Sequence, residues 1–293
     1  MTTMTDELES LLSNPMAKDS TDRRDFMKVT LGTGFAAAVL PTLSQAAITT
    51  DTDGLEAGTV QLNIDGQAVP AYRAQPKEGR KLPVVLLVSE IFGIHHYIAD
   101  IARRYAKLGY LALAPNLFVR QGDPTRYESI PELMKEIIAK VPDAQVMHDL
   151  DACVAWAAEH GGDTSRLAVT GYCWGGRITW MYAAHNPKVK AGVAWYGRVV
   201  QDKTALQPQH PVDIAPELKV PVLGLYGGRD TGISLASVDQ MKAALAKGNS
   251  GSEIVVYPDA GHGFHADYRP SYVEADAKDG WTRCIAWMKR HGV

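Results

Sequence analysis

The sequence predicts an α/β fold in which helices cover both faces of a mostly parallel sheet. Short apolar runs alternate along the chain with longer segments of helical periodicity, the pattern that parallel strands joined by crossover helices produce. The run at residues 82–88 (LPVVLLV) is continuously apolar, as expected of a central strand buried on both faces. The chain has 293 residues, 46% of them hydrophobic and 22% charged, enough for a substantial core.

The other elements follow in chain order. Two alternating strands at 59–64 and 69–74 flank a turn at Gly66 and form a hairpin before the central strand. Further strands are expected at 109–115, 165–170, 191–196, 218–227 and 253–258, and helices at 98–108, 131–140, 143–160, 177–185 and about 272–290. No internal repeat and no Pro-rich or Ser-rich linker divides this body, so we expect one domain.

The first 46 residues have a different character. Arg23-Arg24 precedes Phe26 and a mildly apolar run from Val29 to Leu40, and Ser44-Gln45-Ala46 fits a small-x-small cleavage site. This pattern is typical of a twin-arginine export signal, although a poorly cleaved anchor or a chance Arg-Arg pair in a tail would also produce it. The apolar run is too short to span a bilayer. We expect a signal peptide at 1–46, a mature domain at 47–293, export by the twin-arginine machinery, a periplasmic location and no stable membrane anchor.

The segment Gly171-Tyr172-Cys173-Trp174-Gly175-Gly176 lies between the strand at 165–170 and the helix at 177–185. A G-x-nucleophile-x-G stretch between a strand and a helix is a nucleophile elbow, because small residues on both sides allow a strained turn. The turn would present the Cys173 thiol at the carboxyl edge of the sheet. The alternative is a structural cysteine buried in a Gly-rich turn.

Two partners for this thiol follow in the chain. Asp230 comes directly after the strand at 218–227, and His262 follows the strand at 253–258. Open α/β sheets build their sites at such strand ends. The order Cys173, Asp230, His262 is the nucleophile, acid, histidine order of α/β-hydrolases. Taken singly, Asp230 could be a turn former and His262 a loop histidine.

The loop after the central strand supplies a further candidate group. In α/β-hydrolases this loop gives the second backbone donor of the oxyanion hole, so we expect the Ile91 N–H to act with the Trp174 N–H. Glu90 is unusual at this position, because a carboxylate beside a reaction centre is costly unless it is hydrogen-bonded or accepts a proton. A solvated residue at the rim of the site is the alternative.

The other cysteines, Cys153 and Cys284, lie in predicted helices. An oxidising compartment would permit a disulfide between them, while Cys173 is expected to stay a free thiol.

These motifs together resemble the dienelactone hydrolase family. The resemblance rests on four segments and covers about residues 55–291: 89–93 (SEIFG), 171–176 (GYCWGG), 227–230 (GGRD) and 260–264 (AGHGF). It implies an α/β-hydrolase fold and hydrolysis of an enol-lactone, 4-carboxymethylenebut-2-en-4-olide, to maleylacetate, without a metal or organic cofactor. It further implies Cys173 as nucleophile, His262 as base, Asp230 orienting the histidine, and Glu90 holding and then deprotonating the thiol when substrate arrives.

The sequence departs from the family at two points. The best-known members have no export signal, and they carry a substrate-binding arginine four residues after the histidine, where this chain has Ala266. We expect Arg269 to take over that contact, with Arg229 as second choice and Arg126 also available. Phe92 and Phe264 are expected to line a site for a small, flat, anionic lactone or ester. If the substrate is neutral, the enzyme is instead a general carboxylic esterase.

The sequence also bears on a metal hydrolase, a non-catalytic binder and a nucleic-acid partner as alternatives. A metal hydrolase built from His262, His265, His95 and His96 fits no standard zinc motif. A non-catalytic small-molecule binder would not need all four candidate catalytic residues. The formal net charge of −3, with no basic stripe, gives no footprint for nucleic acid. We expect a monomer acting on a small molecule.

Overall fold

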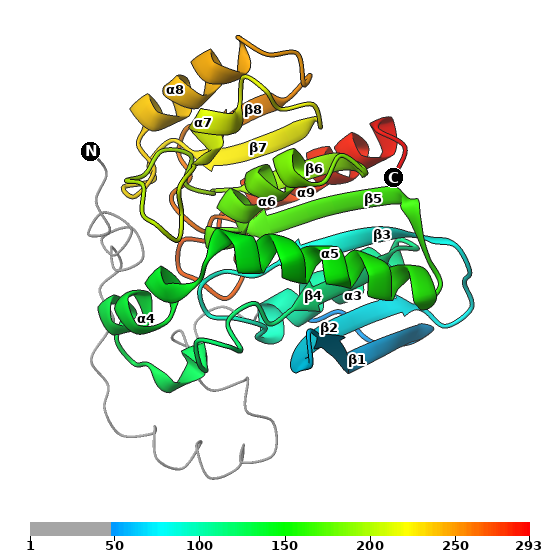
Figure 1. Ribbon diagram of the computed structural model, residues 1–293. Helices are drawn as coiled ribbons and strands as arrows, with labels where there is room; N and C mark the ends of the chain where they lie inside the picture. The colour runs from blue at the N-terminus through cyan, green and yellow to red at the C-terminus, as the bar shows by residue number, and fades with distance from the viewer. Residues whose placement is uncertain (1–47) are drawn as a thin grey trace.

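The computed structural model describes residues 48–293, which form an eight-stranded sheet in the order β1-β2-β4-β3-β5-β6-β7-β8 (Figure 1). The strands are β1 (Leu55–Ile64), β2 (Gln67–Pro76), β3 (Leu82–Val88), β4 (Leu111–Pro115), β5 (Gly162–Tyr172), β6 (Val189–Trp195), β7 (Val222–Gly227) and β8 (Glu253–Tyr257). The strands β3 to β8 are parallel to one another, whereas β1 and β2 are antiparallel additions at one edge. The predicted fold class is confirmed.

The hairpin at the sheet edge has the turn that its sequence favours. Asp65 and Gly66 join β1 to β2 with φ angles of 52° and 81°. A two-residue turn with both φ angles positive matches the twist of antiparallel strands, and Asp-Gly is a preferred pair for it. The hairpin is longer at its open end than predicted, because its ten paired positions continue to Leu55 and Pro76.

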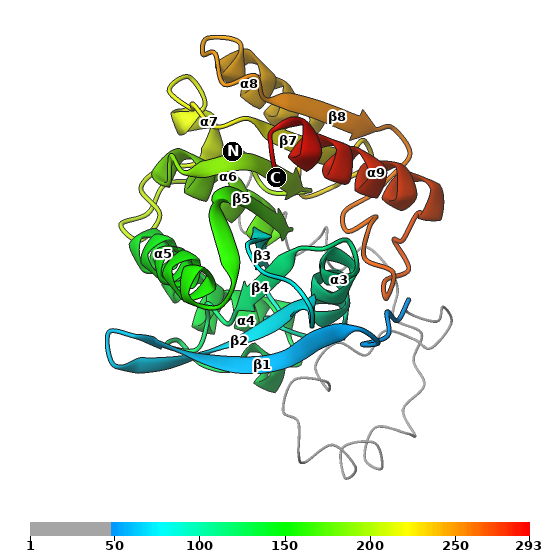
Figure 2. The same ribbon diagram turned by 90° about the vertical axis from the view of Figure 1, so that its right-hand side faces the viewer.

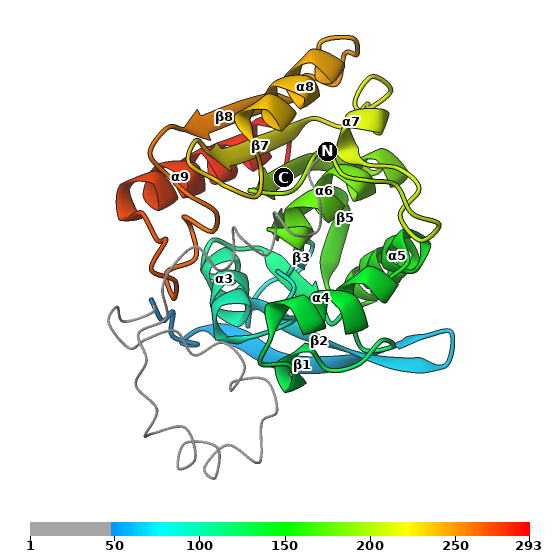
Figure 3. The same cartoon turned by 90° about the vertical axis from the view of Figure 1, so that its left-hand side faces the viewer.

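The helices cover both faces of the sheet (Figure 2). On one face lie α3 (His96–Lys107) and α9 (Glu274–Arg290), and on the other α5 (Asp143–Glu159), α6 (Trp174–His185) and α8 (Leu235–Leu245). Between β4 and α5 the chain makes an excursion through η1 (Pro124–Arg126), α4 (Ile130–Glu136) and η2 (Ile138–Lys140), at one end of the sheet (Figures 1 and 3).

The predicted helices and strands are present, with differences at their ends. The helix expected at 131–140 is divided into α4 and η2. The short α7 (Pro211–Ile214) and the full helix α8 were not predicted. In α8 the Ser234 side chain caps the helix by accepting a hydrogen bond from the Ser237 N–H, a local signal that the sequence contained.

The three cysteines are free, buried thiols. Cys153 lies in α5 and Cys284 in α9, on opposite faces of the sheet, so the disulfide that an oxidising compartment would permit does not form. The Cys284 sulfur instead lies 3.2 Å from the Tyr105 hydroxyl. Burial raises the pKa of Cys284 to about 12 and raises that of Cys153 further, which leaves both thiols unreactive.

The predicted signal peptide at 1–46 lies outside the described residues. Within residues 48–293, every helix is too short or too polar to cross a bilayer.

Candidate active site

Cys173 occupies a strained turn between β5 and α6. Its φ is 54°, in the left-handed region that residues with a side chain rarely adopt. The turn is possible because the backbone packs closely around it. A Cβ on Gly171 would lie 2.2 Å from the Gly175 carbonyl oxygen, and one on Gly175 would lie 2.3 Å from the Val88 carbonyl oxygen. Cys173 is fixed at this turn by a 3.0 Å hydrogen bond from its N–H to the Trp195 carbonyl.

His262 and Asp230 meet at the same edge of the sheet. The Nδ1 atom of His262 lies 2.7 Å from Oδ2 of Asp230. The other carboxylate oxygen of Asp230 accepts the backbone N–H groups of Gly232 and Ile233, at 2.9 and 3.0 Å. A carboxylate fixed in this way keeps the proton of the imidazole on Nδ1 and leaves Nε2 for chemistry.

The Nε2 atom of His262 is the ring nitrogen that remains available to act on Cys173. Nε2 is buried and, among the described residues, has no well-aligned hydrogen-bond partner. Burial works to lower the pKa of His262, but the charge of Asp230 and the sulfur of Cys173 outweigh it and hold the pKa well above its usual value. The three predicted residues are therefore brought to one site: Asp230 contacts His262, and His262 lines the same cavity as Cys173.

Two backbone amides are placed to receive a negatively charged oxygen. Trp174 is the first residue of α6, where backbone N–H groups have no acceptor inside the helix. Ile91 is buried in the loop after β3, and that loop packs on α6 through the close contact of Gly175 with the Val88 and Ser89 carbonyls. The arrangement is compatible with the predicted pairing of the Ile91 and Trp174 amides.

Glu90 is fully buried, so it is not a solvated residue at the rim of the site. Its Oε1 lies 3.1 Å from Nη2 of Arg269, and its Oε2 accepts a 2.5 Å hydrogen bond from the Tyr268 hydroxyl. The Nε2 atom of His95 lies 3.5 Å from the same Oε2. Burial alone would raise the pKa of Glu90, but the Arg269 charge, with His95 and Tyr268, lowers it to about 2. The carboxylate is therefore ionised at neutral pH.

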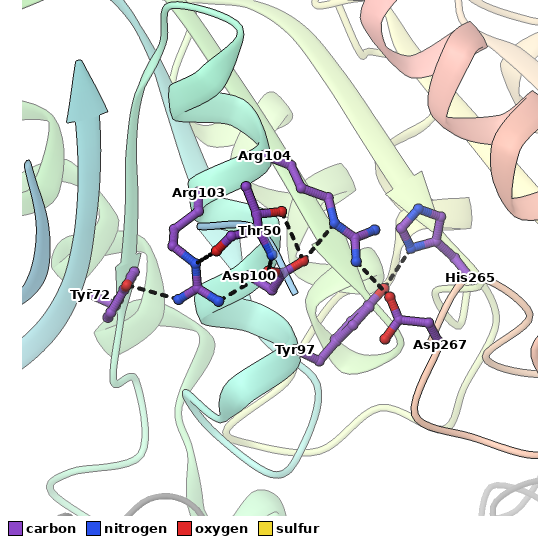
Figure 4. Close-up of polar contacts among 8 residues, drawn as sticks. All are labelled: Thr50, Tyr72, Tyr97, Asp100, Arg103, Arg104, His265 and Asp267. Carbon is purple, nitrogen blue, oxygen red and sulfur yellow. Dashed lines mark hydrogen bonds and ion pairs between the residues drawn. The ribbon is translucent and has the colours of Figure 1, made fainter. Parts of the chain in front are cut away.

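The loop that carries His262, Tyr268 and Arg269 is tied to α3 by two buried polar contacts (Figure 4). The Tyr97 hydroxyl lies 2.6 Å from Nδ1 of His265, and Arg104 joins Asp100 of its own helix to Asp267 of the loop, at 2.6 and 2.5 Å. Burial, with the charge of Arg104, lowers the pKa of His265 to about 3, so this histidine is neutral. Because these contacts fix the loop, they also fix the position of His262.

A cavity of about 180 Å³ opens beside the thiol. Its lining includes Cys173, Trp174 and His262, together with Ile138 and Ala139 of η2. The remaining lining residues are Met134, Arg177, Tyr196, Arg198, Gln201, Asp202, Thr204, Gln207, Gly232 and Ile233.

The predicted substrate-binding residues lie around this cavity rather than on its lining. Arg269 is ion-paired with Glu90, and its guanidinium lies 5.3 Å from the ring centres of both Phe92 and Tyr268. The Arg229 side chain is 71% exposed and paired with Asp259. Phe264 is fully buried behind Tyr196, with ring centres 5.4 Å apart. None of these contacts tests a role in substrate binding, which stays a prediction.

Arg126 lies on the surface. Its side chain is 82% exposed and pairs with Asp123 of its own turn.

Sequence reasoning missed several groups at the site. Tyr268 and His95 hold Glu90. Tyr268 belongs to no motif, and His95 was considered only as a metal ligand, so its contact with this carboxylate was not expected. Arg198 lines the cavity just after β6. Its signal was present, because it follows a strand end that faces the elbow.

The histidines weighed as metal ligands have other environments. His265 contacts Tyr97, and His96 is exposed at the start of α3. Within residues 48–293, no group of three or more His, Cys, Asp or Glu side chains is arranged to hold a metal ion.

Comparison with known proteins gives consistent matches. The family model described as "Dienelactone hydrolase family" matches residues 69–292. A protein of Methylorubrum extorquens named "Putative carboxymethylenebutenolidase" is 54% identical over the full length of both chains, and one of Escherichia coli K12 with the same name is 52% identical over 91% of this chain and 98% of its own. The crystal structure of a "Putative Dienelactone Hydrolase" from Klebsiella pneumoniae is 55% identical and superimposes with a TM-score of 0.79, covering 80% of this chain and 99% of its own.

The close packing at the elbow leads to a testable expectation. Gly171→Ala places a methyl group 2.2 Å from the Gly175 carbonyl, so the free energy of unfolding should fall by at least about 1–3 kcal/mol and the thiol should be displaced. Gly261→Ala is the matched control, because its Cβ meets nothing within 4 Å and its φ is not positive. Thermal unfolding of both variants checks the expectation, and equal melting temperatures would contradict it.

Proposed function

The chain belongs to the dienelactone hydrolase family, and on that premise we propose that it cleaves a small lactone or carboxylic ester through a cysteine nucleophile. The family supports hydrolysis of lactones and esters. One observation carries the proposal of a cysteine mechanism. Cys173 stands on a strained elbow beside His262, whose other nitrogen is 2.7 Å from Asp230.

In the first half of the reaction, the sulfur of Cys173 forms a bond to the carbonyl carbon of the ester. We propose that the thiol proton passes to Glu90 and that His262, whose pKa Asp230 and the Cys173 sulfur raise, is the protonated partner in this step. The Ile91 and Trp174 amides stabilise the oxyanion of the tetrahedral intermediate, each by about 3 kcal/mol. The carbon–oxygen bond of the leaving group then breaks, and protonated His262 donates its proton to that oxygen.

In the second half, His262 is neutral and takes a proton from a water molecule, whose oxygen attacks the thioester. The carbon–sulfur bond breaks, and the thiolate recovers its proton from Glu90. The net change is the addition of one water across the ester bond. When the substrate is a lactone, the leaving alcohol stays attached to the acyl chain, so a single open-chain product is released.

Glu90 can accept the proton only if its surroundings change. At a pKa of about 2 the carboxylate is a weak base, and the largest favourable contribution to that value is the charge of Arg269. We propose that a substrate entering the site loosens the contact between Arg269 and Glu90, which raises the pKa of Glu90 and makes it a proton acceptor. The same event would let Arg269 contact the substrate, the role expected for it from the sequence.

The substrate is proposed from the relatives. Proteins 52–54% identical to this chain are named carboxymethylenebutenolidases, so an enol-lactone that bears a carboxylate is the first substrate to test. We also propose that the first 46 residues direct export of the folded enzyme by the twin-arginine route. The enzyme would then act in the periplasm, as a monomer.

The nucleophile is tested by removing the thiol. Cys173→Ala should lower kcat/KM for a p-nitrophenyl ester by at least about 10³-fold, because the sulfur that forms the acyl intermediate is removed. Rapid quenching of the wild-type enzyme with a slowly hydrolysed ester should show the acyl mass on the peptide that contains Cys173. Cys153→Ala, in which a buried thiol outside the site is removed, should keep the activity. Full activity of Cys173→Ala would refute a cysteine mechanism.

The role of Glu90 is tested by Glu90→Gln, which keeps the shape of the side chain and removes the base. If Glu90 takes the thiol proton, kcat/KM should fall by about 10²–10⁴-fold. Glu132→Gln, on the exposed face of α4, is the control for loss of one negative charge near the site and should have no effect. A loss under about threefold for Glu90→Gln would show that His262 takes the thiol proton instead.

The export proposal is tested in cells. Replacing both Arg23 and Arg24 by Lys should leave the full-length chain in the cytoplasm, whereas the wild type should appear in the periplasmic fraction with Ala47 as its first residue. Mass spectrometry of the two fractions makes the measurement. Periplasmic recovery of the double variant at the wild-type level would exclude the twin-arginine route.

A further inference from the structure

We infer that Ile138 limits the size of the acyl group that this enzyme accepts, so that its substrates are esters or lactones whose acyl part is one small ring or a short chain. The inference rests on the proposed cysteine mechanism, because it concerns the group bound to the thiol during turnover. It adds to that proposal a residue that determines specificity. From the sequence, Ile138 was expected only as part of a helix at 131–140.

The acyl group has to be accommodated beside Cys173. In the acyl intermediate it is bonded to the sulfur, and the leaving alcohol has departed unless the substrate is a lactone. Cys173 is only 2% exposed, so a group bonded to its sulfur extends into the cavity that this residue lines. The size of that cavity therefore decides which acyl groups fit.

The cavity is small. Its volume is about 180 Å³, and an engineered protein cavity of about 150 Å³ with apolar walls binds benzene. The cavity beside Cys173 thus has room for one ring with a short substituent. A longer chain would have to push lining residues aside or leave apolar carbon in water, and both are unfavourable.

The excursion between β4 and α5 contributes an apolar part of the lining. Met134 of α4 and Ile138 and Ala139 of η2 line the cavity there. Met134 and Ile138 are almost completely buried, whereas Ala139 is exposed. A methionine is flexible and adapts to its surroundings, but the β-branched side chain of an isoleucine is stiff. Ile138 is therefore the lining residue of this segment that limits the space most strictly.

A break in the helix separates Ile138 from its neighbour. α4 ends at Glu136, and Ile137, with φ −117° and ψ −65°, leads into the tighter turn η2. Ile137 packs on Gly122, where a Cβ would lie 2.7 Å from the Ile137 Cδ1 atom. The φ of Gly122 is 142°, which favours glycine. The two adjacent isoleucines therefore have different surroundings, and of the two it is Ile138 that lines the cavity.

Buried polar contacts hold this segment at a fixed distance from the thiol. Asp143 begins α5 directly after the excursion, and its two carboxylate oxygens each accept a 2.7 Å hydrogen bond from Arg177. Arg177 lies one turn after Cys173 on α6. Near the start of the excursion, Gln121 donates a 2.8 Å hydrogen bond to Gln145 of α5. Because both ends are fastened, the segment resists displacement by a larger acyl group.

The test uses p-nitrophenyl esters whose acyl chain grows from butanoate to octanoate. For the wild type, kcat/KM should be at least about tenfold lower for the octanoate, because even one methylene that does not fit a pocket costs about tenfold or more. Ile138→Ala removes an ethyl and a methyl group from the lining. It should raise the octanoate-to-butanoate ratio at least about tenfold and change the butanoate value less than about threefold.

Ile137→Ala is the matched control, because it removes the same atoms from the adjacent buried position and should leave the ratio unchanged. Thermal unfolding shows which variants are folded at the assay temperature. Ile138→Val loses less stability than the alanine variant and should move the ratio in the same direction by a smaller amount.

Three outcomes would overturn the inference. Equal kcat/KM values of the wild type for butanoate and octanoate would show that the cavity sets no limit on size. An unchanged ratio in folded Ile138→Ala and Ile138→Val would place the limit at another residue. An equal rise in Ile137→Ala would show that loosening of the segment, rather than the bulk of Ile138, controls the size.

A thiol reagent separates this inference from the proposed function. Methyl and hexyl methanethiosulfonate transfer their alkylthio group to a cysteine sulfur and release methanesulfinate, so the alkyl chain takes the place of the acyl chain without cleavage of an ester. Mass spectrometry of the peptide that contains Cys173 gives the two rates. The hexyl-to-methyl ratio should rise at least about tenfold from the wild type to Ile138→Ala and stay unchanged in Ile137→Ala.

The two experiments fail independently. If the wild type hydrolyses none of the esters, the proposed function fails, and the ratio of the two reagents still decides the role of Ile138. Equal reagent ratios in the wild type and Ile138→Ala would reject that role even in an active esterase.

Discussion

The structure of the site depends on how closely the first turn of α6 approaches the ends of three neighbouring strands. Gly175 lies against the carbonyls that end β3, Gly171 against the turn of the elbow itself, and Gly176 against the segment after β6. Side chains at these positions would hold the backbones apart. The approach brings the Cys173 thiol, the loop of Ile91 and the segment of Arg198 to one small volume. A single steric condition, met by glycine, therefore positions the thiol, one predicted oxyanion donor and the segment after β6 together.

The histidine side of the site is fixed in a different way. The loop from Ala260 to Arg269 has no regular secondary structure, and buried side chains hold it in place. Tyr97 and Arg104, about two turns apart on α3, each hold one residue of this loop. Arg104 is itself compensated by two carboxylates, Asp100 and Asp267, so its buried charge is paired. Glu90, Tyr268 and Arg269 form a further polar cluster, which joins the end of this loop to the loop after β3.

How far the sequence could predict this site differs between its parts. The elbow, Asp230 and His262 were found because each directly follows a strand, and a parallel sheet brings all strand ends to one edge. Glu90 was found for the same reason, although its ion pair with Arg269 depends on the path of a loop that follows no periodicity. Tyr268, and the contact of His95 with Glu90, were missed because they depend on side-chain contacts between segments far apart in the chain. Arg198 was missed although it follows a strand end. Helix α8 was missed because its apolar periodicity is weak, although its capping serine could have indicated its start.

The order of the strands has a consequence for biosynthesis. β3 is paired with β4 on one side and β5 on the other, and β7 and β8 join the sheet only after β6. A chain that is still emerging from the ribosome at residue 200 has its cysteine but lacks both Asp230 and His262. Because β7 and β8 come after β6 in the chain, this end of the sheet can be completed only when they have been made. The thiol thus stays without its histidine and acid until nearly the whole chain has been made, and incomplete chains carry no assembled reactive centre.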